Sequence, residues 1–75
     1  MNPDKKITYK LYSWLPKYKI CSKLCGELQS YCALYTVEEV GFIVRVYNSD
    51  QDQDKNSIYW FDDFDDAINY YRSLN

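Results

Sequence analysis

The sequence predicts an α+β fold, in which a small antiparallel sheet of three to four strands packs against a C-terminal helix and a short helix near 16–28. Three observations lead to this prediction. Two β-rich runs flank "EEVG" within residues 30–48, a helical spacing of apolar residues begins after Asp62, and turn formers separate the strands. Strands joined by tight turns pair antiparallel, and we expect the two helices to cover one face of the sheet.

The first element, "KITYKLYSW" at residues 6–14, alternates in its side chains. Ile7, Tyr9 and Leu11 share one side, and the residues between them share the other. Such alternation in a stretch rich in β-formers is typical of a half-buried strand. Pro16 ends this strand, because proline has no N–H to donate to a neighbouring strand.

Residues 16–28 are compatible with two structures. Ile20, Leu24 and Leu28 recur every four residues, which is a helical stripe, and a proline at the start suits a first helical turn. Gly26 weakens such a helix by about 1 kcal/mol relative to alanine. We expect a short helix here, and a strand remains the alternative.

The hairpin across residues 30–48 is the clearest element. The glycine of "EEVG" can adopt the positive φ that a hairpin turn needs. In the second run Phe42, Val44 and Val46 share one face, which we expect in the core. Arg45 lies on the opposite face, and that face is the wetter one because a buried, unpaired guanidinium is costly.

A polar loop, a short strand and a helix complete the chain. Residues 49–57 are rich in turn formers, so we expect a loop there, followed by a strand at "IYWF" (58–61). The final helix is expected near 62–74, with Asp62 as its N-cap and Asp65 as the acid of a capping box. Its apolar stripe is expected at Phe64, Ala67, Ile68, Tyr71 and Leu74.

The length of the chain indicates a single domain, 1–75. No apolar run approaches the ~18 residues that a membrane span needs. The polar start "MNPDKK" has no signal-peptide core, so we expect a cytoplasmic protein without membrane contact. Three cysteines, an odd number, favour reduced thiols over a disulfide framework.

The sequence carries no motif for catalysis or metal binding. It has no histidine, which removes the commonest general base and leaves three cysteines short of four zinc ligands. Asp50, Asp52 and Asp54 begin like a calcium-binding EF-hand loop. Lys55 then stands where that loop needs glycine, and Phe61 where it needs the bidentate glutamate. We therefore expect a non-enzymatic protein with neither metal nor cofactor.

Charge is divided along the chain. Residues 1–23 hold six lysines and one acid, whereas residues 24–75 hold ten acids and three cations. This asymmetry predicts a charged partner. The aspartates of "WFDDFDDAINYY" (60–71) exceed what one helix cap and one dipole partner need. We expect a partner-binding surface made of Asp50, Asp52, Asp54, Tyr59, Trp60, Asp62, Asp63 and Asp66.

Aromatic content also favours protein binding. Nine tyrosines and two tryptophans exceed what so small a core can bury, and these residue types dominate interface hot spots. In size, acidic charge and lack of catalytic residues, the chain resembles the small inhibitors that phages use against host defence, anti-CRISPR proteins among them. The resemblance implies an inhibitor that blocks a nucleic-acid-handling protein with a basic surface. Such an inhibitor acts in the bacterial cytoplasm, and we expect a monomer or weak homodimer.

Two other functions are compatible with the sequence. "KKITYKLYSWLPKYK" interleaves lysines with aromatics, as do modules that track phosphates and stack bases. A small nucleic-acid-binding module using this strand is therefore one alternative, and a bacterial accessory subunit is another. Because the net charge of the chain is −2, direct nucleic-acid binding is less favoured than protein binding.

Overall fold

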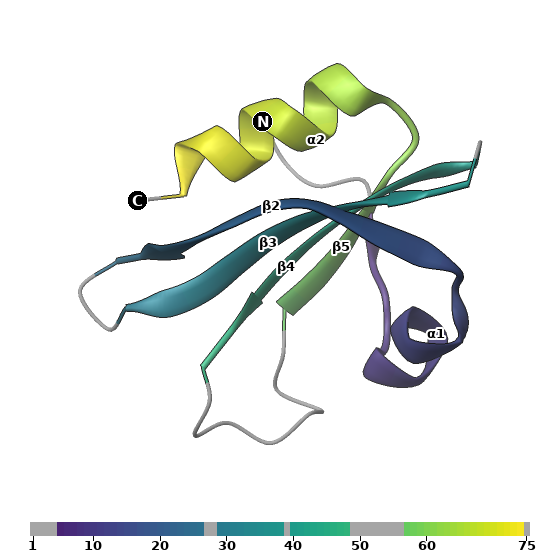
Figure 1. The fold of residues 1–75 in the computed structure, drawn as a ribbon, viewed down its shortest axis with the longest axis horizontal. Helices are drawn as coiled ribbons and strands as arrows, with labels where there is room; N and C mark the ends of the chain where they lie inside the picture. Colours follow the sequence, from purple (N-terminus) through teal and green to yellow (C-terminus); the bar gives the residue numbers. More distant parts are fainter. Residues whose placement is uncertain (1–4, 27–28, 39, 49–56, 75) are drawn as a thin grey trace.

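The computed structural model describes residues 5–26, 29–38, 40–48 and 57–74. Its elements, in chain order, are β1 (Lys5–Lys6), α1 (Tyr9–Trp14), β2 (Lys17–Cys25), β3 (Ser30–Val37), β4 (Gly41–Tyr47), β5 (Ser57–Phe61) and α2 (Phe64–Ser73) (Figure 1). The strands form one antiparallel sheet in the order β1-β5-β4-β3-β2. The α+β class predicted from the sequence is confirmed, as are the hairpin, the strand at "IYWF" and the C-terminal helix.

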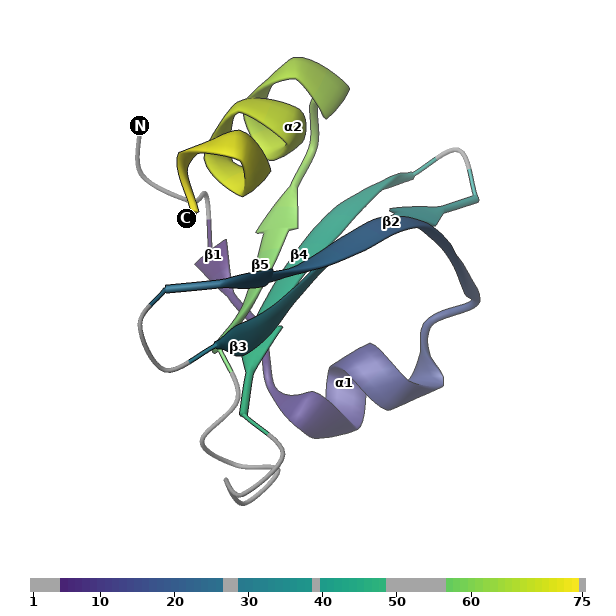
Figure 2. The ribbon, with the colours of Figure 1, turned by 60° about the vertical axis from the view of Figure 1, so that its left-hand side comes forward.

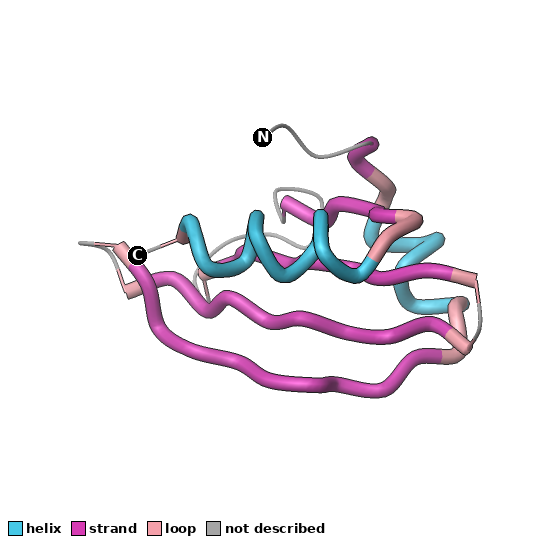
Figure 3. Tube along the Cα trace, turned by 90° about the horizontal axis from the view of Figure 1, so that it is seen from above, coloured by secondary structure: helices cyan, strands magenta, loops and turns pink. Residues whose placement is uncertain are grey.

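The two helices lie on opposite faces of the sheet (Figures 1 and 2). α2 packs across β3, β4 and β5 on one face, which we call the α2 face, and runs along the strands when seen from above (Figure 3). α1 packs on the other face, which we call the α1 face. The prediction that both helices cover one face is therefore wrong. Both faces of the sheet carry apolar residues, so each needs its own helix as a cover.

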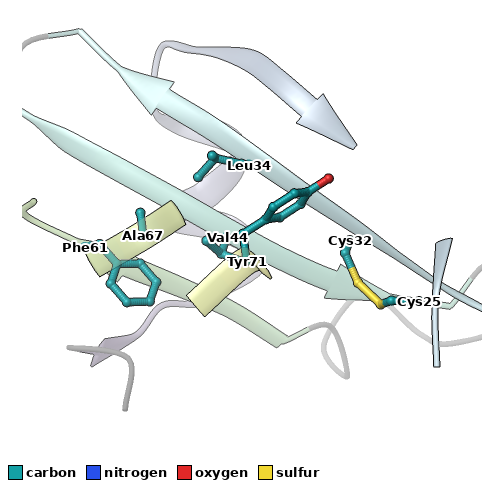
Figure 4. Packing of buried hydrophobic residues seen from close by; sticks show 7 residues of the cluster. All are labelled: Cys25, Cys32, Leu34, Val44, Phe61, Ala67 and Tyr71. Carbon is teal, nitrogen blue, oxygen red and sulfur yellow. A yellow bond between two sulfur atoms is a disulfide. The ribbon is translucent and has the colours of Figure 1, made fainter. Parts of the chain in front are cut away.

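The core of the α2 face surrounds one fully buried phenylalanine, Phe61 (Figure 4). Its buried members are Cys25, Cys32, Leu34, Val44, Phe61, Ala67 and Tyr71. The expected helix stripe is largely confirmed, since Ala67 and Tyr71 are buried and Ile68 and Leu74 pack against this core. Burial raises the pKa of the Tyr71 phenol to about 12, and its hydroxyl lies against the Cys21 thiol.

The core of the α1 face is smaller and consists of Ile7, Tyr12, Val37, Ile43 and Ile58. The β4 strand shows why two cores exist. Val44 has no exposed surface under α2, and Ile43 has none under α1. The predicted core face of β4 is therefore correct, but the opposite face is also buried at Ile43. Arg45 lies further along that second face, half-buried, and donates a hydrogen bond to the Tyr12 hydroxyl at 3.2 Å.

Residues 6–14 do not form the predicted strand. The extended part, β1, stops at Lys6, and α1 begins at Tyr9. Thr8 is the N-cap, because its hydroxyl accepts a hydrogen bond from the Leu11 N–H at 3.1 Å. Tyr9 and Tyr12 are three residues apart, so one helical turn directs both rings toward the sheet, where their centroids lie 5.7 Å apart.

Residues 16–28 do not form the predicted helix, and the strand alternative is correct over Lys17–Cys25. β2 pairs with β3 along its length, with one irregularity between Lys19 and Cys21. Ile20 and Leu24, which suggested a helical stripe, are both exposed. The hydrogen bonds that β3 supplies outweigh the weak local preference for a helix. Gly26 lies in the turn after β2 with φ 74°, a conformation that glycine adopts without strain.

Cys25 and Cys32 are joined by a disulfide between β2 and β3 (Figure 4). Cys21 is a free, half-buried thiol. The prediction of three reduced thiols is wrong for this pair. Both cysteines lie on the α2 face, where Cys25 is opposite Ser30 and Cys32 is opposite Lys23. The argument from cysteine content for a reducing compartment therefore no longer holds.

Removing the disulfide tests its contribution to stability. The double variant Cys25→Ala/Cys32→Ala should lose about 2 kcal/mol of unfolding free energy, because the bridge restricts a short loop of the unfolded chain. Urea titration followed by circular dichroism measures this loss. Cys21→Ala is the control, since it keeps the disulfide, and it should change stability by less than the double variant. Equal stability of the double variant and the parent would contradict the role assigned to the bridge.

Two phenylalanines near the β5–α2 connection test the placement of the core. Phe61 is fully buried, whereas Phe64 is 41% exposed. Phe61→Ala should lower the free energy of unfolding by about 3–5 kcal/mol, because it leaves a cavity under α2. Phe64→Ala should cost less than about 1 kcal/mol, since much of its ring already contacts water. Thermal unfolding of both variants would refute this core if the two lost the same stability.

Candidate protein-binding surface at the start of α2

The sheet brings two distant segments together at one end. Phe42, near the start of β4, lies opposite Phe61, the last residue of β5. The β3–β4 turn and the start of α2 therefore leave the sheet at the same end (Figure 1, right side). The rings of Phe42 and Phe64 make an edge-to-face contact with their centroids 5.3 Å apart. We call this region the acidic end, and it consists of Glu38, Val40, Asp62, Asp63, Phe64, Asp65 and Asp66.

Asp63, not Asp62, is the N-cap of α2. Its side chain accepts a hydrogen bond from the Asp66 backbone N–H at 3.4 Å. Asp62 has a different partner, because the Trp60 indole N–H donates to its Oδ1 at 2.8 Å. The predicted cap was therefore placed one residue too early. Asp65 and Asp66 occupy the first turn, where the helix dipole favours negative charge.

Trp60 is held in place by the hairpin beside it. Its six-membered ring lies so close to Gly41 that a Cβ at this position would overlap it. Gly41 is thus required for space, and the expected positive φ is wrong, since Gly26 is the glycine with positive φ among the described residues. This close contact fixes the indole, and the indole in turn orients the Asp62 carboxylate.

Four aspartates lie close together at the start of α2. Within the described ranges none of the four forms an ion pair, and residues 57–71 contain no lysine or arginine. Asp62, Asp63 and Asp65 are exposed and Asp66 is half-buried. Phe64, between these aspartates in the chain, is 41% exposed, and Val40, just before β4 at the same end of the sheet, is 61% exposed. The acidic end therefore combines repelling carboxylates with apolar groups that face water.

Three of the predicted site residues, Asp62, Asp63 and Asp66, lie within the acidic end. Trp60 packs against the core of the α1 face and is joined to the acidic end by its hydrogen bond to Asp62. Tyr59 lies outside the acidic end, because it points to the α2 face, where its ring contacts Tyr70 with centroids 5.5 Å apart. Asp50, Asp52 and Asp54 lie outside the described residues, as does the start of the calcium-loop pattern.

Sequence reasoning missed the apolar members of the surface. Phe64 was assigned to the buried stripe of the helix, although it is exposed. Val40 follows two glutamates at the tip of the hairpin, where a turn residue has no core to face. A signal was present, because "DDFDD" surrounds a phenylalanine with acids on both sides. A core position is seldom flanked in this way, since neighbouring side chains must remain in water.

In residues 5–26, 29–38, 40–48 and 57–74, no three His, Cys, Asp or Glu side chains gather as a metal site. Neither described helix is long and apolar enough to cross a membrane. Comparisons of the chain with protein-family models, curated proteins and solved structures gave no match.

Alanine substitution distinguishes the capping aspartate from its neighbours. Asp63→Ala should lower the free energy of unfolding by about 0.5–2 kcal/mol, since a free backbone N–H is left at the start of α2. Asp65→Ala should change it by less than about 0.5 kcal/mol, because an exposed charge near the helix dipole contributes little. Chemical denaturation of the two variants measures the difference. A larger loss for Asp65→Ala would show that the helix start is assigned wrongly.

Proposed function

We propose that this chain is a non-enzymatic protein-binding inhibitor that covers a basic surface of a nucleic-acid-handling partner with its acidic end. The observation that carries the proposal is the group of four aspartates around an exposed phenylalanine, none of which pairs with a cation of the described residues. Like charges so close together repel one another. Lysines and arginines of a partner would relieve this repulsion, so the charge arrangement favours the bound state.

The apolar side chains of the acidic end can supply the binding affinity that its charges alone do not. Rim charges chiefly raise association rates and select partners, whereas aromatic anchors supply most of the affinity. Phe64 can serve as the anchor because its ring is exposed and its inner side rests on Phe42. The aspartates around it then act as the charged rim.

A row of carboxylates resembles the phosphates of a nucleic acid in charge and in hydrogen-bond acceptors. A protein that binds nucleic acid presents arginines and lysines to those phosphates, and these are the groups the acidic end can occupy. The inhibitor and the nucleic acid would then compete for one site. A phage-type inhibitor in the cytoplasm of a bacterial host fits this mode of action.

Support for the nucleic-acid-binding alternative is weaker. It rests on a strand that displays lysines and tyrosines alternately over residues 6–14. That stretch contains a helix, and Tyr12 is buried against the sheet. The expected stacking platform is thus missing from this part of the chain, and the accessory-subunit alternative has no feature that favours it.

The proposal is tested with a double variant that removes charge but keeps the fold. Asp65→Asn/Asp66→Asn leaves the cap Asp63 and the Trp60–Asp62 hydrogen bond in place. Wild type should retain a basic nucleic-acid-binding protein from nuclease-treated bacterial lysate, and added nucleic acid should displace it. The double variant should bind that protein about tenfold or more weakly, with a flatter salt dependence, because charge pairs at the interface are lost.

A matched control raises the net charge equally at the other end of α2. Asn69 and Ser73 are both exposed, and Asn69→Lys/Ser73→Lys changes the charge by the same two units. This control should bind nearly as tightly as wild type. Equal weakening in both variants would mean that only net charge matters. Undiminished binding of Asp65→Asn/Asp66→Asn would rule out the acidic end as the interface.

A further inference from the structure

α1 is apolar on two sides, although it is a short surface helix. Tyr9, Tyr12 and Leu15 pack toward the sheet and belong to the core of the α1 face. On the outer side Leu11 is 45% exposed and Trp14 is 79% exposed. A helix that covers a sheet normally turns polar residues to water. The outer side of α1 therefore presents an apolar surface that its role in the fold does not explain.

This outer side contains a hollow of about 250 Å³, lined by Thr8, Lys10, Leu11 and Trp14. Lys10 and Leu11 precede Trp14 by four and three residues, so one helical turn brings them to a common side. Small-molecule sites usually enclose ~300–1,000 Å³. The hollow lies below that range and is open to solvent, which suits an apolar side chain presented by another protein.

The charge around the hollow indicates the kind of partner. Residues 5–26, which include all of α1 and β2, contain six lysines and no acid, although Lys23 lies over the Tyr71 ring on the other face of the sheet. Lys10 itself lines the hollow and is exposed. A partner that inserts an apolar side chain here gains additional attraction if carboxylates flank that side chain. Basic flanks would instead be repelled.

We propose that the hollow on α1 binds a segment of a partner protein in which leucine or phenylalanine alternates with aspartate or glutamate. The apolar side chain packs against Trp14 and Leu11, and a neighbouring carboxylate pairs with the Lys10 ammonium. This site lies on the opposite side of the sheet from α2 (Figure 2). It therefore goes beyond the function proposed for the acidic end and does not depend on it.

Two other occupants fit the observations less well. A single-stranded nucleic acid usually needs several aromatic platforms along a basic groove, whereas the hollow offers the single ring of Trp14 beside Lys10. A second copy offers Phe64 among aspartates, which has the right chemistry. Such a contact joins two different surfaces, so it would build a ring or an open filament instead of the weak homodimer expected from the sequence.

Nuclear magnetic resonance titration of the full chain tests the site with defined probes. The first probe is a short synthetic peptide that alternates Asp with Leu and Phe, and its matched control replaces every Asp by Asn. The acidic peptide should bind saturably and shift the Trp14 indole N–H and the amides of α1. The Asn peptide should bind several-fold more weakly, because only the carboxylates can pair with Lys10.

Variants then locate the contact. Trp14→Ala should weaken binding of the acidic peptide about tenfold or more, since an aromatic anchor is lost. Tyr18→Ala removes another exposed ring outside the hollow and should bind as wild type does. Both side chains lie outside the two cores, so both variants should melt near the parent temperature. The acidic-end variant Asp65→Asn/Asp66→Asn should also bind the peptide normally.

Several results would overturn the proposal. These are no saturable shift with the acidic peptide, equal binding of the Asn peptide, or binding that survives Trp14→Ala. A single-stranded oligonucleotide that shifts the same residues more strongly would assign the hollow to nucleic acid. Concentration-dependent self-association that Trp14→Ala abolishes, measured by sedimentation, would assign it to a second copy.

Discussion

The burial of β4 from both sides is the constraint on which the rest of this structure depends. Val44 and Ile43 are neighbours in the chain, yet each is fully buried under a different helix. Central strands of a sheet in so short a chain are not usually covered twice, because few residues remain for the covers. Here α2 covers one face with ten residues, and α1 covers part of the other with six.

Tyrosine side chains complete the incomplete cover on the α1 face. The Arg45 guanidinium lies 3.9 Å from the centroid of Tyr47 and 4.8 Å from that of Tyr12. The Tyr47 ring in turn stacks on Tyr31, with centroids 5.5 Å apart. These large rings, packed on the Arg45 guanidinium, shield the sheet from water beyond the end of the short helix α1. Part of the unusual tyrosine content thus serves the fold, which lowers the number of aromatic residues available for binding.

Elements with a strong local signal were predictable, and elements defined by their neighbours were not. The hairpin, β5 and α2 each combine a regular spacing with a clear boundary residue. The first third of the chain lacks both. Three apolar residues at alternate positions are also compatible with one turn of helix. The Thr8 N-cap favours the helix, and residues 9–14 are therefore helical. β2 is a strand because β3 lies beside it, and its own sequence is equally compatible with a helix. The acids of the candidate site could be found from sequence, but the ring contact that joins Phe64 to Phe42 in β4 could not.

The lysines near the N-terminus serve two purposes. β2 is one of the two outer strands of the described sheet, and it exposes Tyr18 and Ile20. An apolar edge of this kind invites pairing with another chain. Two features oppose such pairing. A second β2 would place its lysines near Lys19 and Lys23, and like charges repel. The irregularity between Lys19 and Cys21 also interrupts the regular register that a new strand would need. The same positive charge, continued onto α1 by Lys10, attracts carboxylates to a place where no backbone edge is open. The positive charge that protects the sheet from self-pairing thus also fits the acidic segment proposed for the hollow on α1, which would bind through side chains.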